Sequence, residues 1–173
     1  HEKNLWVGTD GGGLNMLDRK KNEFLHFTHQ SENASSICGN HVLTVIEDSD
    51  NNIWTGTWGD GVTMFNPKKN IYKHYTHDPA DTNSLSGNNV WIIFEDQAKN
   101  IWIGAQEKGL DRLDPRTGKF VHYVTGRDGL SSNDFISIMQ ERNGRLWVGT
   151  AGSGLNTYDP KTNRFVPFPY KDA

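Results

Sequence analysis

The sequence predicts an all-β fold built from a repeated unit of four short strands, and three observations support this prediction. A tryptophan returns at near-constant intervals along the chain of 173 residues, at Trp6, Trp54, Trp102 and Trp147. Each of these tryptophans lies within the same short sequence phrase. The chain is also rich in glycine, with 18, and its mean hydropathy is only -0.71, as expected for many short strands joined by tight turns.

The repeated phrase defines the strands of the unit. An aliphatic residue, the tryptophan and a Gly-Thr or Gly-Ala pair form one strand, found at 5–9, 53–57, 101–105 and 146–150. A glycine and an aliphatic residue open the next strand, at Gly13, Gly61, Gly109 and Gly154, and an aromatic residue marks the one after it, at Phe24, Tyr72, Phe120 and Phe165. Three copies carry a further apolar run upstream, at 42–46, 90–94 and 135–139, and the first copy lacks it.

The turns between these strands have residues suited to their geometry. Gly118 stands at a turn position that the other copies fill with Asn22, Asn70 and Asn163. Glycine and asparagine are the residues that most readily adopt a left-handed backbone, so we expect a positive φ at all four positions. Helices have little room, because Gly, Asn or Pro interrupts each stretch before a helical pattern accumulates.

Four-stranded units of this length with a buried tryptophan are typical of β-propeller blades, so we predict a β-propeller fragment of about four blades. The expected limits are a partial blade over 1–28, which lacks its inner strand, and blades over 41–76, 89–124 and 134–169. A solenoid β-helix is the alternative architecture, although its repeats are normally shorter. Because neighbouring blades cover each other, we expect the continuous apolar run 90–94 to be buried on both faces.

Composition and charge argue against several classes of partner. The formal net charge of -3 gives no electrostatic reason to expect nucleic acid or an anionic membrane surface. Cys38 is the sole cysteine, which excludes an intrachain disulfide, and no apolar run has the length of a membrane span, so no direct membrane insertion is expected. His1 already lies inside the repeat pattern, so we expect an excised piece of a longer protein.

The phrase that runs from Ser84 to Pro115 resembles the two-component regulator propeller repeat, and the likeness extends over residues 5–168. Such repeats form the periplasmic sensor region of hybrid two-component histidine kinases of the Bacteroides type. The resemblance implies a sensing module for oligosaccharides that relays to a kinase outside this chain, with the remaining propeller blades of the parent protein as partners. It implies no enzymatic activity and no cofactor for this chain.

In a propeller, the loops between successive blades share one face with the loops between the second and third strands, and we place the candidate ligand site there. Trp58 and Trp91 stand outside the repeating tryptophan position, and an exposed indole can stack on a sugar ring. The other candidates are polar residues of the same loops, namely His41, Asp60, Asn88, Asn89, Gln106 and Glu107. The tryptophans and asparagines also have structural alternatives: Trp58 can cap its blade or pack on its neighbour, Trp91 can pack between blades as Leu43 and Ile136 would, and the asparagines can cap turns.

Metal binding and catalysis have weaker support in the sequence. His26, His74 and His122 share one repeat position, so blade symmetry spreads them too far apart to hold one ion. Catalytic motifs are absent, although Asp60 and Glu107 at the channel mouth leave a propeller glycosidase or lyase as one alternative function. A structural or protein-interaction propeller is another. Because an open array leaves its end blades uncovered, we also expect the isolated chain to self-associate.

Overall fold

The structure, a computed structural model, describes residues 4–169 and contains strands and turns but no helix within that range. Within residues 4–169, fifteen strands form four antiparallel sheets. The first sheet contains β1 (Leu5–Thr9), β2 (Gly13–Asp18) and β3 (Glu23–Phe27), and the second contains β4 (Val42–Glu47), β5 (Ile53–Thr57), β6 (Val62–Asn66) and β7 (Ile71–Tyr75). The third contains β8 (Val90–Glu95), β9 (Ile101–Ala105), β10 (Gly109–Asp114) and β11 (Lys119–Tyr123), and the fourth contains β12 (Phe135–Gln140), β13 (Leu146–Thr150), β14 (Leu155–Asp159) and β15 (Arg164–Pro167).

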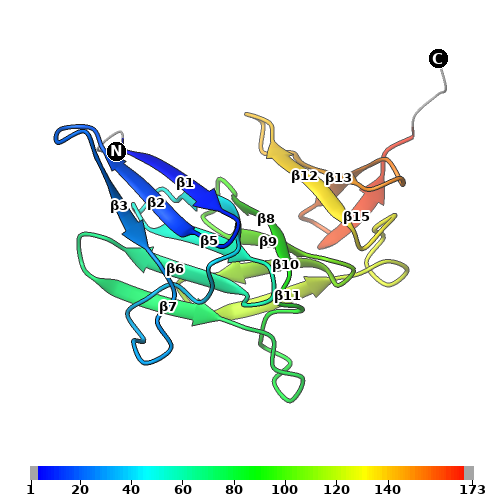
Figure 1. Ribbon diagram of the computed structural model, residues 1–173. Coiled ribbons are helices and arrows are strands. Elements are labelled where there is room, and N and C mark those ends of the chain that lie inside the picture. The colour runs from blue at the N-terminus through cyan, green and yellow to red at the C-terminus, as the bar shows by residue number, and fades with distance from the viewer. Residues whose placement is uncertain (1–3, 170–173) are drawn as a thin grey trace.

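Each sheet is a simple meander in which neighbouring strands along the chain are hydrogen-bonded neighbours in the sheet. The sheets follow one another in chain order, from the blue N-terminal sheet to the orange and red C-terminal one (Figure 1). Strand β8 packs beside both β4 and β12, and β4 packs beside β1. This arrangement confirms the predicted β-propeller fragment, including the missing inner strand of the first sheet, and it excludes the β-helix. The residue limits assigned to the blades stay a prediction, and residues 1–3 of the first blade lie outside the described range.

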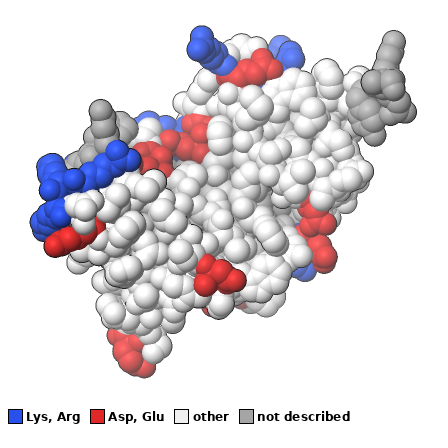
Figure 2. Space-filling model, turned by 45° about the horizontal axis from the view of Figure 1, so that its top comes forward, with Lys and Arg blue, Asp and Glu red and all other residues white. Residues whose placement is uncertain are grey.

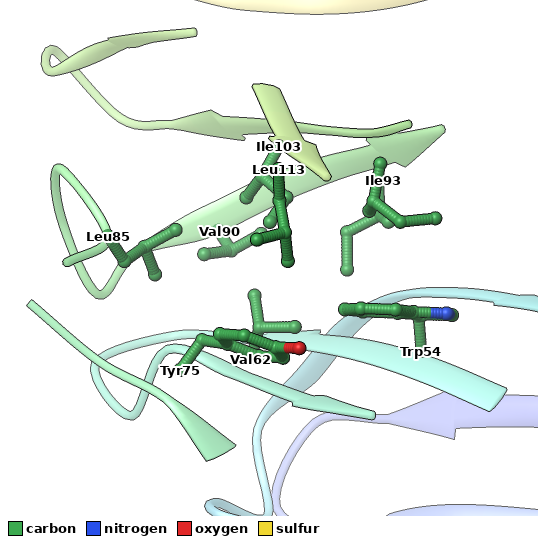
Figure 3. Packing of buried hydrophobic residues seen from close by; sticks show 9 residues of the cluster. Trp54, Val62, Tyr75, Leu85, Val90, Ile93, Ile103 and Leu113 are labelled. Atoms are coloured by element: carbon green, nitrogen blue, oxygen red, sulfur yellow. The ribbon is translucent and has the colours of Figure 1, made fainter. Parts of the chain in front are cut away.

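In each of the first three sheets, three repeat positions form the contact with the sheet that follows. In the second sheet they are Trp54, Val62 and Tyr75, which pack against Val90 and Ile93 of the third sheet and their neighbours. Figure 3 shows the Trp54 and Tyr75 rings of one sheet facing these aliphatic side chains of the other. The equivalent residues Trp102, Leu110 and Tyr123 meet the fourth sheet, and Trp6, Leu14 and Phe27 meet the second.

The same three positions in the fourth sheet lack a cover among the described residues. Leu155 is 46% exposed and Phe168 is 44% exposed, whereas Val62 and Leu110 are buried. Trp147 is half-buried and packs on Phe168, while Trp54 and Trp102 are fully buried. The environment of each tryptophan therefore follows from whether a complete pair of sheets surrounds it.

Each complete sheet also fixes its tryptophan by a hydrogen bond to the turn before it. The indole nitrogens of Trp54 and Trp102 donate to carboxylate oxygens of Asp48 and Asp96, at 2.7 and 2.8 Å, and that of Trp147 donates to Glu141. Asp48 also accepts from the backbone of Asp50 and Asn52, so one carboxylate shapes the turn and anchors the ring. The hydrogen bond from Trp147 lowers the pKa of Glu141 below its usual value.

The predicted left-handed turn positions are confirmed. Asn22, Asn70 and Asn163 have φ values of 54°, 52° and 55°, and Gly118 has a φ of 70°. The Asp or Asn that begins each of these turns accepts a hydrogen bond from the backbone two residues later, as Asp18 does from Lys20. Local turn chemistry and the repeat therefore specify the same hairpin in every sheet.

Candidate functional site

The loops that the sequence assigned to one face do meet there. The backbone nitrogens of Trp58, Gln106 and Ala151 donate to the carbonyl oxygens of His41, Asn89 and Asp134, at 2.9, 2.9 and 3.0 Å. In each complete sheet, this bond ties the turn between the second and third strands to the start of the inner strand. The side chains carried by these two segments are thus held close to one another at the rim of the inner strands.

A β-bulge at the start of each inner strand turns one apolar residue outward. The register shifts between Val42 and Thr44, between Val90 and Ile92 and between Phe135 and Ser137, and the residues inside these shifts are Leu43, Trp91 and Ile136. They are 37%, 49% and 71% exposed. The expectation that the run 90–94 is buried on both faces is therefore wrong at Trp91, because the extra residue of a bulge leaves the ladder and re-aims its side chain.

Trp58 and Trp91 form an exposed aromatic pair that joins two sheets. Trp58 lies in the turn after β5, and Trp91 lies in the bulge of β8. Their ring centroids are 5.8 Å apart and their planes meet at 87°, an edge-to-face contact that holds both rings in a defined orientation. Trp58 remains 45% exposed and Trp91 remains 49% exposed, so each indole offers a large apolar surface to solvent.

A cavity of about 290 Å³ opens next to Trp91, between the third and fourth sheets. Trp91, Phe135 and Ile136 supply its apolar wall, and Gln106 and Asp134 supply polar groups. The side-chain oxygen of Gln106 accepts from the Asn89 amide at 3.4 Å, and Asp134 accepts from the backbone nitrogen of Glu107 at 2.8 Å. The cavity thus combines aromatic and aliphatic surface with a few oriented hydrogen-bonding groups, which is the usual composition of a small-molecule site.

The remaining polar candidates divide between this site and the framework of the loops. The Asn88 side-chain oxygen accepts from the backbone nitrogen of His77 at 2.7 Å, as Asn40 does from His29 at the same distance, so this oxygen caps a loop. Its backbone carbonyl accepts from Gly61. The exposed His41 ring contacts the carboxylate of Asp10 at 2.6 Å, across the boundary between the first two sheets.

Asp60 and Glu107 belong to different surroundings. Asp60 lines a broad pocket of about 700 Å³ beneath the 28–41 loop, together with Cys38, His74 and Asn88. Glu107 is exposed, has a φ of 57° and lines neither this pocket nor the cavity beside Trp91. The pairing of these two carboxylates for acid–base catalysis therefore gains no support from the geometry.

The outer-strand histidines hold loops in place. His74 and His122 contact the carbonyl oxygens of Ala34 and Thr82 through Nε2, at 3.1 and 3.0 Å, and so fasten each inter-sheet loop to the sheet that follows it. The hydrogen bond between His122 Nδ1 and the carboxylate of the buried Asp111, at 2.7 Å, raises the pKa of His122. Asp111 also accepts a hydrogen bond from the backbone nitrogen of Ser86. The buried Ser86 hydroxyl has no hydrogen-bond partner, so it does not donate to His122. This Ser, His and Asp set therefore lacks the contact that activates a nucleophile.

Two further properties concern the described range, 4–169. No three His, Cys, Asp or Glu side chains lie near enough to one another to hold a metal ion. No helix there has the length and apolar character of a membrane span.

Burial raises the pKa of the Cys38 thiol, which makes this side chain a poor nucleophile at neutral pH.

Sequence reasoning missed the contribution of Phe135, Ile136 and Asp134 to the candidate site. The sequence indicated only a packing role for Ile136, as an equivalent of Trp91. The sequence signal for Ile136 is its place directly after the first residue of an inner strand, which Leu43 and Trp91 share. Its outward orientation depends on the bulge, which no single-residue preference reveals.

Comparison with known proteins agrees with this architecture. The sequence profile of the two-component regulator propeller matches residues 36–59, 84–107 and 129–152. Each match begins in an inter-sheet loop and ends in the turn that holds Trp58, Gln106 or Ala151. No curated protein sequence matches the chain.

Solved structures with the same fold include extracellular domains from Bacteroides thetaiotaomicron. That of the hybrid two-component system BT3049 superposes with a TM-score of 0.81 at 22% identity, covering 95% of this chain and 22% of its own. That of the hybrid two-component system BT4673 has a TM-score of 0.74 at 23% identity, covering 96% and 23%. An auxiliary nutrient binding protein from Bacteroides ovatus has a TM-score of 0.63 at 11% identity, covering 96% and 38%. The chain thus spans less than a quarter of the two extracellular domains.

Proposed function

We propose that this chain, whose repeats belong to the two-component regulator propeller family, is part of the ligand-sensing region of a periplasmic sensor and binds an oligosaccharide. In this proposal the chain itself carries no catalytic activity. Binding biases the shape of the sensor region, and a kinase elsewhere in the parent protein reads that change at the inner membrane.

The observation that carries the proposal is the exposed pair of Trp58 and Trp91. The C–H face of a sugar ring is apolar and flat, so it loses water favourably when it packs on an indole. Two indoles held edge to face from adjacent sheets offer surfaces for successive sugar rings. Because their contact already restricts both rings, little side-chain entropy is lost when a ligand binds.

The polar groups beside the pair suit the hydroxyls of such a ligand. Gln106 and Asn89 have amide groups that both donate and accept, and Asp134 accepts. Gln106 and Asp134 line the cavity of about 290 Å³ beside Trp91, and the Asn89 amide donates to Gln106. Residues other than Lys, Arg, Asp and Glu make up most of the molecular face in Figure 2, where the charged residues lie in separate groups. The net charge of -3 also gives no field that would favour a polyanionic ligand.

Isothermal titration calorimetry of the chain against a panel of neutral oligosaccharides tests this function. The variants are Trp58→Ala and Trp91→Leu, the latter because Leu43 occupies the same bulge in the second sheet. Phe24→Ala is the matched control, because Phe24 is an aromatic residue that is 52% exposed on the outer strand β3. Loss of a central aromatic contact costs about 2 kcal/mol or more, so each tryptophan variant should weaken binding about 30-fold.

The proposal fails if no oligosaccharide of the panel binds, or if binding survives in both tryptophan variants. Capture of a periplasmic protein through Trp58 and Trp91, in the absence of any sugar binding, would instead support the alternative of a protein-interaction propeller. Circular dichroism melting curves of each variant show whether a loss of binding reflects the site or the fold.

We also propose that the uncovered face of the fourth sheet meets another sheet of the same repeat. The equivalents of Leu155 are buried between sheets in the other three sheets, and those of Phe168 are buried in the second and third and partly buried in the first. The partner is a further blade of the parent protein, or a second copy of this chain when the chain is isolated. A continuous apolar face of this kind, left open, favours association.

A further inference from the structure

Arg112 breaks the pattern of the repeat at a position between two sheets. The residue lies in the middle of β10, and the equivalent residues of the first two sheets are Met16 and Met64, with Thr157 in the fourth. Met16 is buried and Met64 packs against the core between the second and third sheets. A guanidinium in place of a thioether puts a permanent charge where the repeat otherwise buries apolar surface, which costs free energy unless an anion compensates it.

The guanidinium of Arg112 is held firmly but lacks a carboxylate partner. Its central carbon lies 5.6, 5.8 and 5.7 Å from the ring centroids of Trp102, Tyr123 and Tyr158. One terminal nitrogen donates to the Tyr158 hydroxyl. Arg112 forms no ion pair with any residue in the range 4–169, so its charge is balanced there only by ring faces and one phenol oxygen.

Arg112 lines a cavity of about 350 Å³ at the end of the strands opposite to the tryptophan pair. The turns after β8, β12 and β14 form its rim, and Gln140 and Tyr158 line its sides. Asp96 is the acidic residue of this cavity, yet its two oxygens already accept from Ala98, Asn100 and the Trp102 indole. Its charge reduces the affinity for an anion without pairing with Arg112.

Asn163 supplies a second group of unused donors. Its side-chain oxygen accepts from both the Tyr123 and Tyr158 hydroxyls, at 2.7 and 2.6 Å, which fixes the orientation of the amide. Burial raises the pKa of Tyr123, so this phenol stays neutral and remains a donor. Asn163 also lines the cavity, and its amide nitrogen has no acceptor among residues 4–169.

We propose that this cavity binds an organic carboxylate no larger than a single sugar ring. Arg112 supplies the charge and a planar fork of N–H donors that matches a carboxylate, and Asn163 supplies a further N–H group. The cavity volume limits the rest of the ligand, and the three aromatic rings keep the guanidinium oriented in advance. The site is separate from the tryptophan pair and does not depend on the proposed function.

Titration of the chain with glucuronate, glucose and propionate, followed by calorimetry, tests the proposal. Glucuronate and glucose differ by the carboxylate, and propionate shows whether the ring contributes. We expect millimolar binding of glucuronate that weakens as salt increases, and no binding of glucose at this cavity. A charge-assisted hydrogen bond contributes strongly, so Arg112→Met should weaken glucuronate binding by about 10-fold or more.

The variants are chosen to preserve the fold. Methionine is the natural residue at the equivalent positions 16 and 64, and Asn163→Gly keeps the left-handed turn because Gly118 stands at that position in the third sheet. Arg116→Met is the matched control, since Arg116 is exposed on the same sheet and pairs with Asp114. A Trp58→Ala, Trp91→Leu double variant separates the two sites and should retain glucuronate binding.

Three results would overturn the proposal. The first is that glucuronate does not bind at millimolar concentrations. The second is that glucose binds as tightly as glucuronate, at a site that Arg112→Met leaves intact. The third is that glucuronate binding is lost in Arg116→Met but not in Arg112→Met. If propionate binds as tightly as glucuronate, the site recognises small organic acids and the sugar ring adds nothing. If Arg112→Met does not fold, a several-fold weakening in Asn163→Gly decides the question.

Discussion

Replacing Trp54 by alanine should destabilise the protein far more than the same change at Trp147. The two residues share a repeat position, but Trp54 is fully buried between two sheets and Trp147 is half-buried on the last sheet. A buried tryptophan removes about 150–250 Å² from water, which corresponds to about 4–6 kcal/mol at about 25 cal/mol per Å². Measured large-to-small changes in protein cores cost about 3–5 kcal/mol, so the two magnitudes agree.

The assay is thermal unfolding followed by far-ultraviolet circular dichroism. At about 2–4 °C per kcal/mol, Trp54→Ala should lower the melting temperature by about 6–20 °C. Trp147→Ala should cost clearly less, because part of the Trp147 ring already contacts solvent and no following sheet covers it. Equal losses in the two variants would refute the reasoning, since they would mean that the following sheet contributes nothing to the burial of Trp54.

Three further predictions concern the contact of His122 with Asp111, the close packing of Gly39 on Asp60, and the uncovered face of the fourth sheet. The hydrogen bond to Asp111 raises the pKa of His122, so protonation of the ring favours the folded state. The resulting contribution to the free energy of unfolding is fully present below the ordinary histidine pKa of about 6.5. It is lost as the pH rises through the raised pKa of the folded state. His122→Gln should remove this pH dependence from urea unfolding midpoints, and an unchanged profile would contradict the assignment. A Cβ at Gly39 would clash with the side chain of Asp60. Gly39→Ala should therefore cost about 1–3 kcal/mol of stability, and adding Asp60→Gly should restore most of this loss. A strictly additive double variant would argue against the clash. Leu155→Lys places a charge on the uncovered face of the fourth sheet, so it should reduce self-association measured by sedimentation velocity. A monomeric wild-type chain would contradict the proposed self-association through this face.

The elements that the sequence predicted well are those set by local chemistry and by the repeat. Asn22, Asn70 and Asn163 were placed in left-handed turns because few other residues adopt that backbone, and the structure agrees. The tryptophans marked the sheet boundaries because each stacked pair of sheets requires one large ring. These features reappear in every copy, so each copy checks the others.

The site was less predictable, because it depends on where copies differ and on backbone irregularities. Trp91 aligns with Leu43 and Ile136, which suggested packing, and only the bulge shows that all three point outward. Asp60 and Glu107 looked like neighbours on one face, yet Asp60 lines a pocket under a loop that Glu107 does not reach. Nothing in the sequence marked Arg112 as a candidate, because its significance depends on the three rings that surround it.

Nuclear magnetic resonance of the indole N–H groups during an oligosaccharide titration would examine the proposed site most directly. The chain contains six tryptophans, and their indole signals report separately on the sheet boundaries and on the rim. We expect the Trp58 and Trp91 signals to shift with ligand concentration, while those of the buried Trp54 and Trp102 stay in place. Shifts confined to Trp54 or Trp102, or a saturating ligand that moves neither Trp58 nor Trp91, would contradict the proposed binding site.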